Sequence, residues 1–272
     1  MKYTNITPSF GVELATGTQL ADFTDDEVTA LKQLAAERGI VVAREQKMDV
    51  KTQADFGHRL GKLMNSPVNK ADIPEELIVI RAGPKSKAVA GQGWHTDVSS
   101  EAVPPGLSML RMEVVPPSGG DTLFADMYQA FETLSPSMQD FLKQLHARHD
   151  PRGHYLYLSG AKKLEELPSS VHPVVRTHPL TGRNALYVNA GFVAKIEELS
   201  QRESDTLLAM LYDHVAYSAS IQCRVQWAPN SVVFWDNRVV QHHAAFDYHP
   251  EVRLGYRVTV VGDKPYLAFS DC

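Results

Sequence analysis

The chain has 272 residues, of which 43% are hydrophobic, so it is long enough to bury a large core. Its formal net charge is -5, from 32 acidic and 27 basic residues without a long run of either sign, which argues against a nucleic-acid partner and favours a small-molecule substrate. Only two cysteines occur, which excludes a disulfide framework and a thiolate zinc cluster and fits a reducing cytosol. No stretch approaches the roughly 18 apolar residues of a membrane-spanning helix, and the amino end lacks a leader pattern, so we expect a cytoplasmic protein without a membrane partner.

Helix and strand signals alternate in the first third of the chain. Thr24 and Glu27 form a capping box that predicts a helix, and Gly39 is the expected stop of that helix. Three further elements are expected in this region: a strand at 40–44, a helix at 50–63 and a strand at 77–81.

Short β runs dominate the rest of the chain. Bounded by Gly, Pro, Asn and Asp, these runs are expected at 107–115, 121–124, 172–179, 184–189, 221–227, 231–236 and 253–261. Helical inserts are expected at 127–145 and 200–217, the second with a capping box of Ser200 and Glu203. The pattern predicts a mainly β fold, a sandwich or jelly roll with flanking helices. No repeat or linker divides it, so we expect one domain over residues 1–272.

The segment "GQGWHTDVSS" (91–100) places His95 and Asp97 two residues apart. If this segment is a strand, its alternation puts both side chains on one face, where one cation could accept both. A lone His-X-Asp is weak evidence, but a distant segment, 235–262, offers further histidines, among them His242 and His243. Two histidines and one carboxylate with open positions are typical of non-haem Fe(II) oxygenases, and a zinc hydrolase is the alternative from another class.

Several separated blocks carry a family resemblance. The blocks "WHTDV", "PPSGGDTLFADMYQAFETLSP", "HPVVRTHPLTGRNALYVNAGF" and "VVFWDNRVVQHHAAFDYHPEVRLGYRVTVVGDKP" resemble the taurine dioxygenase family of Fe(II)- and 2-oxoglutarate-dependent oxygenases, from about residue 7 to residue 266. The resemblance implies a double-stranded β-helix, the cupin-like jelly roll. It also implies an enzyme that uses Fe(II), 2-oxoglutarate and O2, forms succinate and CO2, and hydroxylates an unactivated C–H of a small anionic substrate. Desaturation and isonitrile formation are oxidative outcomes that the sequence does not separate from hydroxylation.

The resemblance also implies roles for individual residues. It makes His95, Asp97 and His242 the iron ligands, with His243 on the opposite face of its strand. A hydroxyl and a guanidinium would hold the distal carboxylate of 2-oxoglutarate, and these belong to Thr122 and Arg253. Arginine suits that carboxylate because its planar fork donates two charge-assisted hydrogen bonds.

The substrate pocket is where the chain departs from the family pattern. Arg257 and the backbone N–H of Val98 match positions that meet the substrate's anionic group. Where taurine-specific members carry a histidine, a tyrosine and an asparagine, this chain has Ser66, Asn69 and Gly91. Other pocket-lining positions are occupied by His154, Tyr155 and Phe192. We therefore expect a roomier pocket with different polar groups.

Other conspicuous residues are expected to be structural. Trp94 and Trp235 would be packing walls, Arg238 would brace the strand before His242, and Arg111 and Arg176 would form ion pairs. The family places substrate-covering segments near 82–93 and 150–170, where the sequence fits a lid and a plain surface loop equally well. A homo-oligomer is left open.

Overall fold

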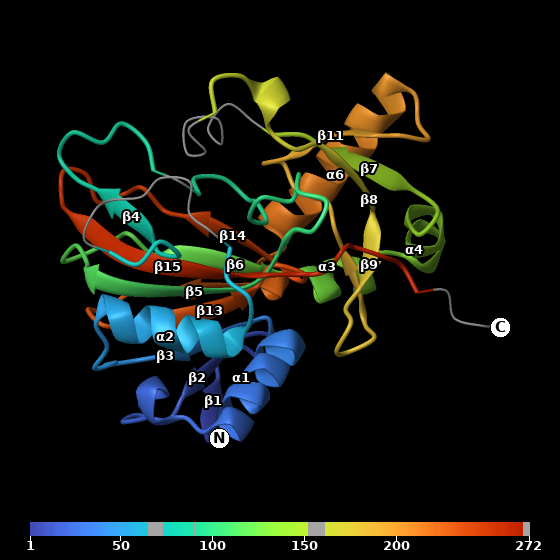
Figure 1. Cartoon of the computed structure of the whole chain (residues 1–272). Helices are drawn as coiled ribbons and strands as arrows, with labels where there is room; N and C mark the ends of the chain where they lie inside the picture. Colours follow the sequence, from blue (N-terminus) through green and yellow to red (C-terminus); the bar gives the residue numbers. More distant parts are fainter. Residues whose placement is uncertain (65–72, 90, 152–160, 269–272) are drawn as a thin grey trace.

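The structure of the protein is a computed structural model that describes residues 1–64, 73–89, 91–151 and 161–268 (Figure 1). Strands make up most of its regular structure, which confirms the expected mainly β fold with flanking helices. Among the described residues, no helix is both long and apolar enough to cross a membrane.

A seven-stranded sheet forms the centre of the molecule (Figure 1). In spatial order its strands are β1 (Tyr3–Asn5), β2 (Val12–Leu14), β3 (Ile40–Ala43), β13 (Val232–Asp236), β5 (Pro105–Val114), β15 (Arg253–Val261) and β4 (Ile78–Ala82). Neighbours pair antiparallel, except that β2 and β3 are parallel. Both faces of the sheet are buried, because β13 sends Val233 and Trp235 into one apolar cluster and Val232 and Phe234 into the other.

Two helices cover one face of this sheet, α1 (Asp25–Arg38) and α2 (Val50–Leu60) (Figure 1). The predicted capping box of Thr24 and Glu27 is present, and Gly39 ends α1 with φ of 75°, a backbone angle that glycine adopts without strain. The second helix is shorter than the predicted 50–63, because the backbone leaves the helical conformation at Gly61.

A three-stranded sheet packs against the opposite face of the large sheet. Its order is β12 (Gln222–Val225), β6 (Thr122–Asp126) and β14 (Val240–Ala244). Phe124 of β6 and Val240 of β14 share one apolar cluster with Met112 of β5. The two facing sheets form a sandwich. The candidate site lies beside three of its strands: β14 carries His242, β5 carries Ser108, and β15 carries Arg253 and Arg257.

The remaining elements build a second layer beside the sandwich. They are the strands β7 (His146–His149), β8 (Ser170–Pro173), β9 (Val175–Thr177), β10 (Asn184–Leu186) and β11 (Val193–Ile196), the helices α3 (Met127–Glu132), α4 (Pro136–Leu142) and α6 (Gln201–Tyr217), and the 3-10 turns Leu164–Glu166 and Ala219–Ile221. The 3-10 turn Leu20–Asp22 lies apart from them, with Leu20 buried in the apolar cluster shared by α1 and α2. The prediction of one helical insert over 127–145 was wrong. Ser135 caps a new helix and Pro136 occupies its first turn, so the insert divides into α3 and α4.

Candidate active site

A short backbone bridge joins two segments that are far apart in sequence. His95 N donates to His242 O at 3.1 Å, and His242 N donates to His95 O at 2.9 Å. One step further along, Ala244 N donates to Gly91 O at 2.9 Å, so the loop before His95 runs antiparallel to β14. This pairing puts the two imidazole rings side by side, with centroids 4.1 Å apart.

Asp97 reaches the same place by a turn. Residues 91–100 do not form a strand, so strand alternation is not what brings His95 and Asp97 together: His95 makes an isolated bridge, and residues 97–100 form a turn closed by the hydrogen bond from Glu101 N to Val98 O. Val98 has φ of 42°, the left-handed conformation, and this bends the chain back. The convergence of His95 and Asp97 therefore comes from turn geometry.

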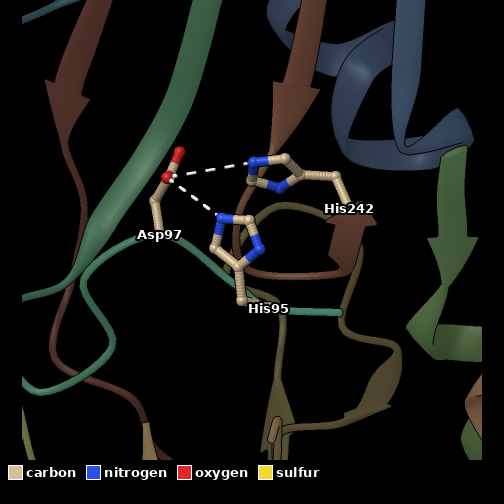
Figure 2. Close-up of side chains that lie close together, drawn as sticks. All are labelled: His95, Asp97 and His242. Carbon is tan, nitrogen blue, oxygen red and sulfur yellow. Dashed lines mark ion pairs between the residues drawn. The ribbon is translucent and has the colours of Figure 1, made fainter. Parts of the chain in front are cut away.

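The three side chains meet in one cluster (Figure 2). Oδ1 of Asp97 lies 3.9 Å from Nε2 of His95 and 3.9 Å from Nε2 of His242. The potential ligand atoms all lie within 4.8 Å of one another. Two imidazole nitrogens and one carboxylate oxygen are a donor set that suits Fe(II), so the cluster could hold that ion.

The electrostatics keep Asp97 and His242 in the protonation states that a metal requires. Burial alone would raise the pKa of Asp97, but the charges of Arg257, His242 and His95 outweigh it and lower the pKa to about 2. Burial, assisted by His95, holds the pKa of His242 well below its ordinary value. At neutral pH Asp97 is an anion and His242 is neutral, as metal ligands are.

Neighbouring groups fix the two rings. Nδ1 of His95 lies 2.9 Å from Gly93 O, so a proton on Nδ1 would leave the Nε2 lone pair facing Asp97. Trp235 and Phe124 pack against His242 at centroid distances of 5.0 Å and 6.1 Å. The next residue, His243, turns the other way and meets the edge of Trp94.

Arg257 lies at the edge of this cluster. Its Nη1 donates to Oδ1 of Asp97 at 2.9 Å, which places a guanidinium directly beside the candidate metal ligands. Its Nε is buried and has no hydrogen-bond partner among the described residues. The sequence predicted a substrate-facing Arg257 but gave no sign of its ion pair with Asp97.

Arg253 and Thr122 lie together in a second polar corner. Arg253 is 6% exposed, its Nε donates to Gly120 O at 3.2 Å, and its guanidinium lies 5.5 Å from the ring centre of Trp227. Trp227 Nε1 donates to Oγ1 of Thr122 at 3.0 Å, which leaves the Thr122 hydroxyl hydrogen free to donate elsewhere. Within the described part of the chain, no carboxylate forms an ion pair with Arg253.

The candidate substrate residues are placed only in part. A Cβ on Gly91 would lie 3.3 Å from Cε1 of His95, so Gly91 borders the cluster. Gly191 packs against Cβ of His95, which brings the buried Phe192 close to the site, and Val98 follows Asp97 directly. The other predicted pocket residues, Ser66, Asn69, His154 and Tyr155, lie outside the described residues.

The residues expected to be structural do make structural contacts. Arg238 pairs with Asp236 and Asp263. Arg176 pairs with Asp263, and Arg111 pairs with Glu113.

Three contributors were missed at the sequence level: Ser108, Asn237 and Trp227. Ser108 donates to Oδ2 of Asp97, Asn237 donates to Ser108, and Trp227 lies under Arg253. The signal for Ser108 was present, because it is a lone small polar residue in an otherwise apolar strand, "GLSML".

Comparison with known proteins identifies the family. The sequence profile of the family described as "Taurine catabolism dioxygenase TauD, TfdA family" matches residues 2–259. The chain belongs to this family. It is 37% identical over 285 residues to an alpha-ketoglutarate-dependent sulfonate dioxygenase of Saccharomyces cerevisiae, covering 97% of this chain and 68% of that protein. It is 32% identical over 251 residues to an alpha-ketoglutarate-dependent sulfate ester dioxygenase of Pseudomonas putida, covering 88% and 82%.

A solved structure supports the same family assignment. A taurine dioxygenase from Burkholderia xenovorans superimposes with a TM-score of 0.84 at 30% identity, covering 97% of this chain and 92% of that chain. The sandwich described above is therefore the cupin-like jelly roll, the double-stranded β-helix that the sequence predicted. The TauD/TfdA protein is an Fe(II)- and 2-oxoglutarate-dependent dioxygenase (2-oxoglutarate is alpha-ketoglutarate), with O2 as cosubstrate and a small molecule as substrate. The alternative of a zinc hydrolase is set aside.

The neighbouring histidines allow a sharp test of the cluster. His242→Ala is expected to abolish Fe(II) binding and turnover, whereas His243→Ala is expected to keep much of both, because adjacent strand residues point to opposite faces. Iron content and succinate formation measured on both folded variants check this. An inactive His243→Ala beside an active His242→Ala would show that the ligand lies one residue further along.

Proposed function

We propose that the enzyme hydroxylates a small organic anion, a sulfonate, sulfate ester or carboxylate, and that Arg257 binds the anionic group. The observation that carries the proposal is the position of Arg257, whose guanidinium touches Asp97 and keeps a buried Nε free of partners among the described residues. Its remaining donors can therefore bind an anion beside the metal ligands. The yeast relative is a sulfonate dioxygenase and the Pseudomonas putida relative is a sulfate ester dioxygenase, which supports the same substrate classes.

In this proposal His95, Asp97 and His242 hold Fe(II). Three protein ligands leave three positions of an octahedron open. When bound, the iron and 2-oxoglutarate supply the oxidising chemistry, with succinate and CO2 as products. The charges of Arg257, His242 and His95 hold Asp97 as a carboxylate despite its burial, burial keeps His242 neutral, and Trp235 packs against the ring of His242.

Arg253 and Thr122 bind the distal carboxylate of 2-oxoglutarate in this proposal. A guanidinium buried without an anionic partner is costly, so the site fits a ligand that brings a carboxylate. The free hydroxyl hydrogen of Thr122 can donate to the same carboxylate. Arg253 and Arg257 belong to the same strand, β15, and alternate residues of a strand share one face, so both guanidinium groups serve one pocket.

We also propose that residues 1–272 form one domain. The large sheet joins β1 near the amino end to β15 near the carboxyl end, which supports this division. A cytoplasmic location, the absence of nucleic-acid and membrane partners, and homo-oligomer formation stay predictions from sequence.

Arg253→Ala is expected to raise the concentration of 2-oxoglutarate needed for half-maximal rate by about 30-fold to several thousand-fold. The reason is that truncating one partner of a buried charge pair costs about 2 to 5 kcal/mol. Arg253→Lys keeps the charge but loses the two-pronged fork, so it should fall between Ala and wild type. Steady-state titration with 2-oxoglutarate measures all three proteins. An unchanged requirement in Arg253→Ala would mean that another cation, Arg257 foremost, holds that carboxylate.

Taurine is expected to be a poor substrate. Ser66, Asn69 and Gly91 replace larger donors that taurine-specific members place around the amino-sulfonate. Losing two hydrogen bonds to charged groups, at about 1.5 to 3 kcal/mol each, weakens binding by roughly a hundredfold or far more. The vacated volume should admit bulkier acids.

A screen of sulfonates, sulfate esters and carboxylates, scored by succinate formation, compares these substrates with taurine directly. A micromolar Michaelis constant for taurine, tightly coupled to sulfite release, would contradict our account of the pocket. Turnover of uncharged analogues as fast as that of the anions would contradict the role given to Arg257.

A further inference from the structure

The two oxygens of the Asp97 carboxylate have different partners. Oδ1 faces His95 and His242 and accepts a hydrogen bond from Arg257. Oδ2 accepts from the hydroxyl of Ser108, at 3.3 Å, and Ser108 is its one hydrogen-bond donor among the residues that the structure describes. Asp97 and Ser108 are both buried, at 5% and 0% exposed.

The Ser108 hydroxyl has its direction set by a chain of hydrogen bonds. Trp235 Nε1 donates to Oδ1 of Asn237 at 3.0 Å, which assigns the oxygen of that amide. The Nδ2 of Asn237 then donates both hydrogens, to Gly106 O and to Oγ of Ser108, each at 2.9 Å. Because Oγ of Ser108 accepts from Asn237, its own hydrogen is directed to Asp97.

The hydrogen bonds of this series therefore all run in one direction, from the indole of Trp235 through Asn237 and Ser108 to the carboxylate of Asp97. Trp235, Asn237 and Ser108 are at most 2% exposed, and hydrogen bonds arranged in series in a buried setting strengthen one another. Trp235 also packs against the ring of His242. One indole thus packs against one candidate ligand and, through two polar side chains, fixes the orientation of another.

We propose that Ser108 is a positioning residue that, held by Asn237 and Trp235, turns Asp97 so that it offers the metal one oxygen, Oδ1. The proposal rests on the proposed function, in which His95, Asp97 and His242 hold the iron. A carboxylate that used both oxygens would fill one more position of the octahedron, and the chelating 2-oxoglutarate and O2 need all three that remain. Ser108 keeps Oδ2 out of the coordination shell.

The opposite strand supplies a matched control. Thr259 of β15 pairs directly with Ser108 of β5, and directly opposed residues lie on the same face of a sheet. Its hydroxyl is buried and has no hydrogen-bond partner in the described part of the chain. Thr259→Val removes that hydroxyl with little change in shape. It therefore tests for a general effect of removing a buried hydroxyl beside Ser108.

The test uses the whole protein with Mn(II) as the metal probe, titrated by calorimetry with and without the 2-oxoglutarate analogue N-oxalylglycine. Ser108→Ala is expected to weaken Mn(II) binding by about 10- to 100-fold, the usual loss when a group that orients a ligand is removed. Ser108→Thr, which restores the hydroxyl, should recover most of the affinity, and Thr259→Val should leave it unchanged. Thermal unfolding close to wild type shows that each variant is folded.

A crystal structure of Ser108→Ala with Mn(II) and N-oxalylglycine gives the second readout, which a purely structural role would not change. We expect both oxygens of Asp97 to bind the metal in Ser108→Ala, whereas one oxygen binds it in the wild-type protein. Wild-type affinity with one oxygen bound in Ser108→Ala would overturn the proposal, and so would an equal loss in Ser108→Ala and Thr259→Val. If the wild-type protein binds no Mn(II), or His242→Ala binds it equally well, the metal assignment itself fails.

Discussion

The two backbone hydrogen bonds between His95 and His242 are the constraint on which the rest of the site depends. They join a loop to a strand that lies far along the chain, and they set two imidazoles at the spacing of a shared cation. The turn after His95 then brings Asp97 to the same point. Burying this carboxylate would be unfavourable alone, and the ion pair with Arg257 and the hydroxyl of Ser108 offset that cost.

Strand β15 organises the anion chemistry around this cluster. It carries Arg253 and Arg257 on one face, and each meets a different environment. Arg253 lies over Trp227 in the polar corner that it shares with Thr122, where burial lowers its pKa, without an ionic partner in the described residues. Arg257 is tied to Asp97. Arg253 therefore fits a cosubstrate carboxylate at a distance from the proposed iron site, and Arg257 fits a substrate anion near that site.

Local signals in the sequence predicted the fold well where they were strong. The caps at Thr24 and Ser200, the continuous apolar run of β13 and the alternating apolar residues of β15 predict their elements without help from the rest of the chain. The short strands β1, β2, β7 and β11 were missed, because three or four residues carry too little periodicity and their pairing is set by distant partners. The metal cluster was predictable from family blocks, whereas the Ser108 contact was not, because it depends on which strand faces the turn that follows His95.

The central claim is that His95, Asp97 and His242 hold Fe(II) with two adjacent positions open to a chelating 2-oxo acid. Anaerobic addition of Fe(II) and 2-oxoglutarate to the folded protein tests it most directly, because a chelated 2-oxo acid gives a weak visible charge-transfer band. The account predicts this band in wild type and its loss in a folded His242→Ala variant. A folded, iron-loaded wild-type protein without the band, or a variant that keeps it, would contradict the account.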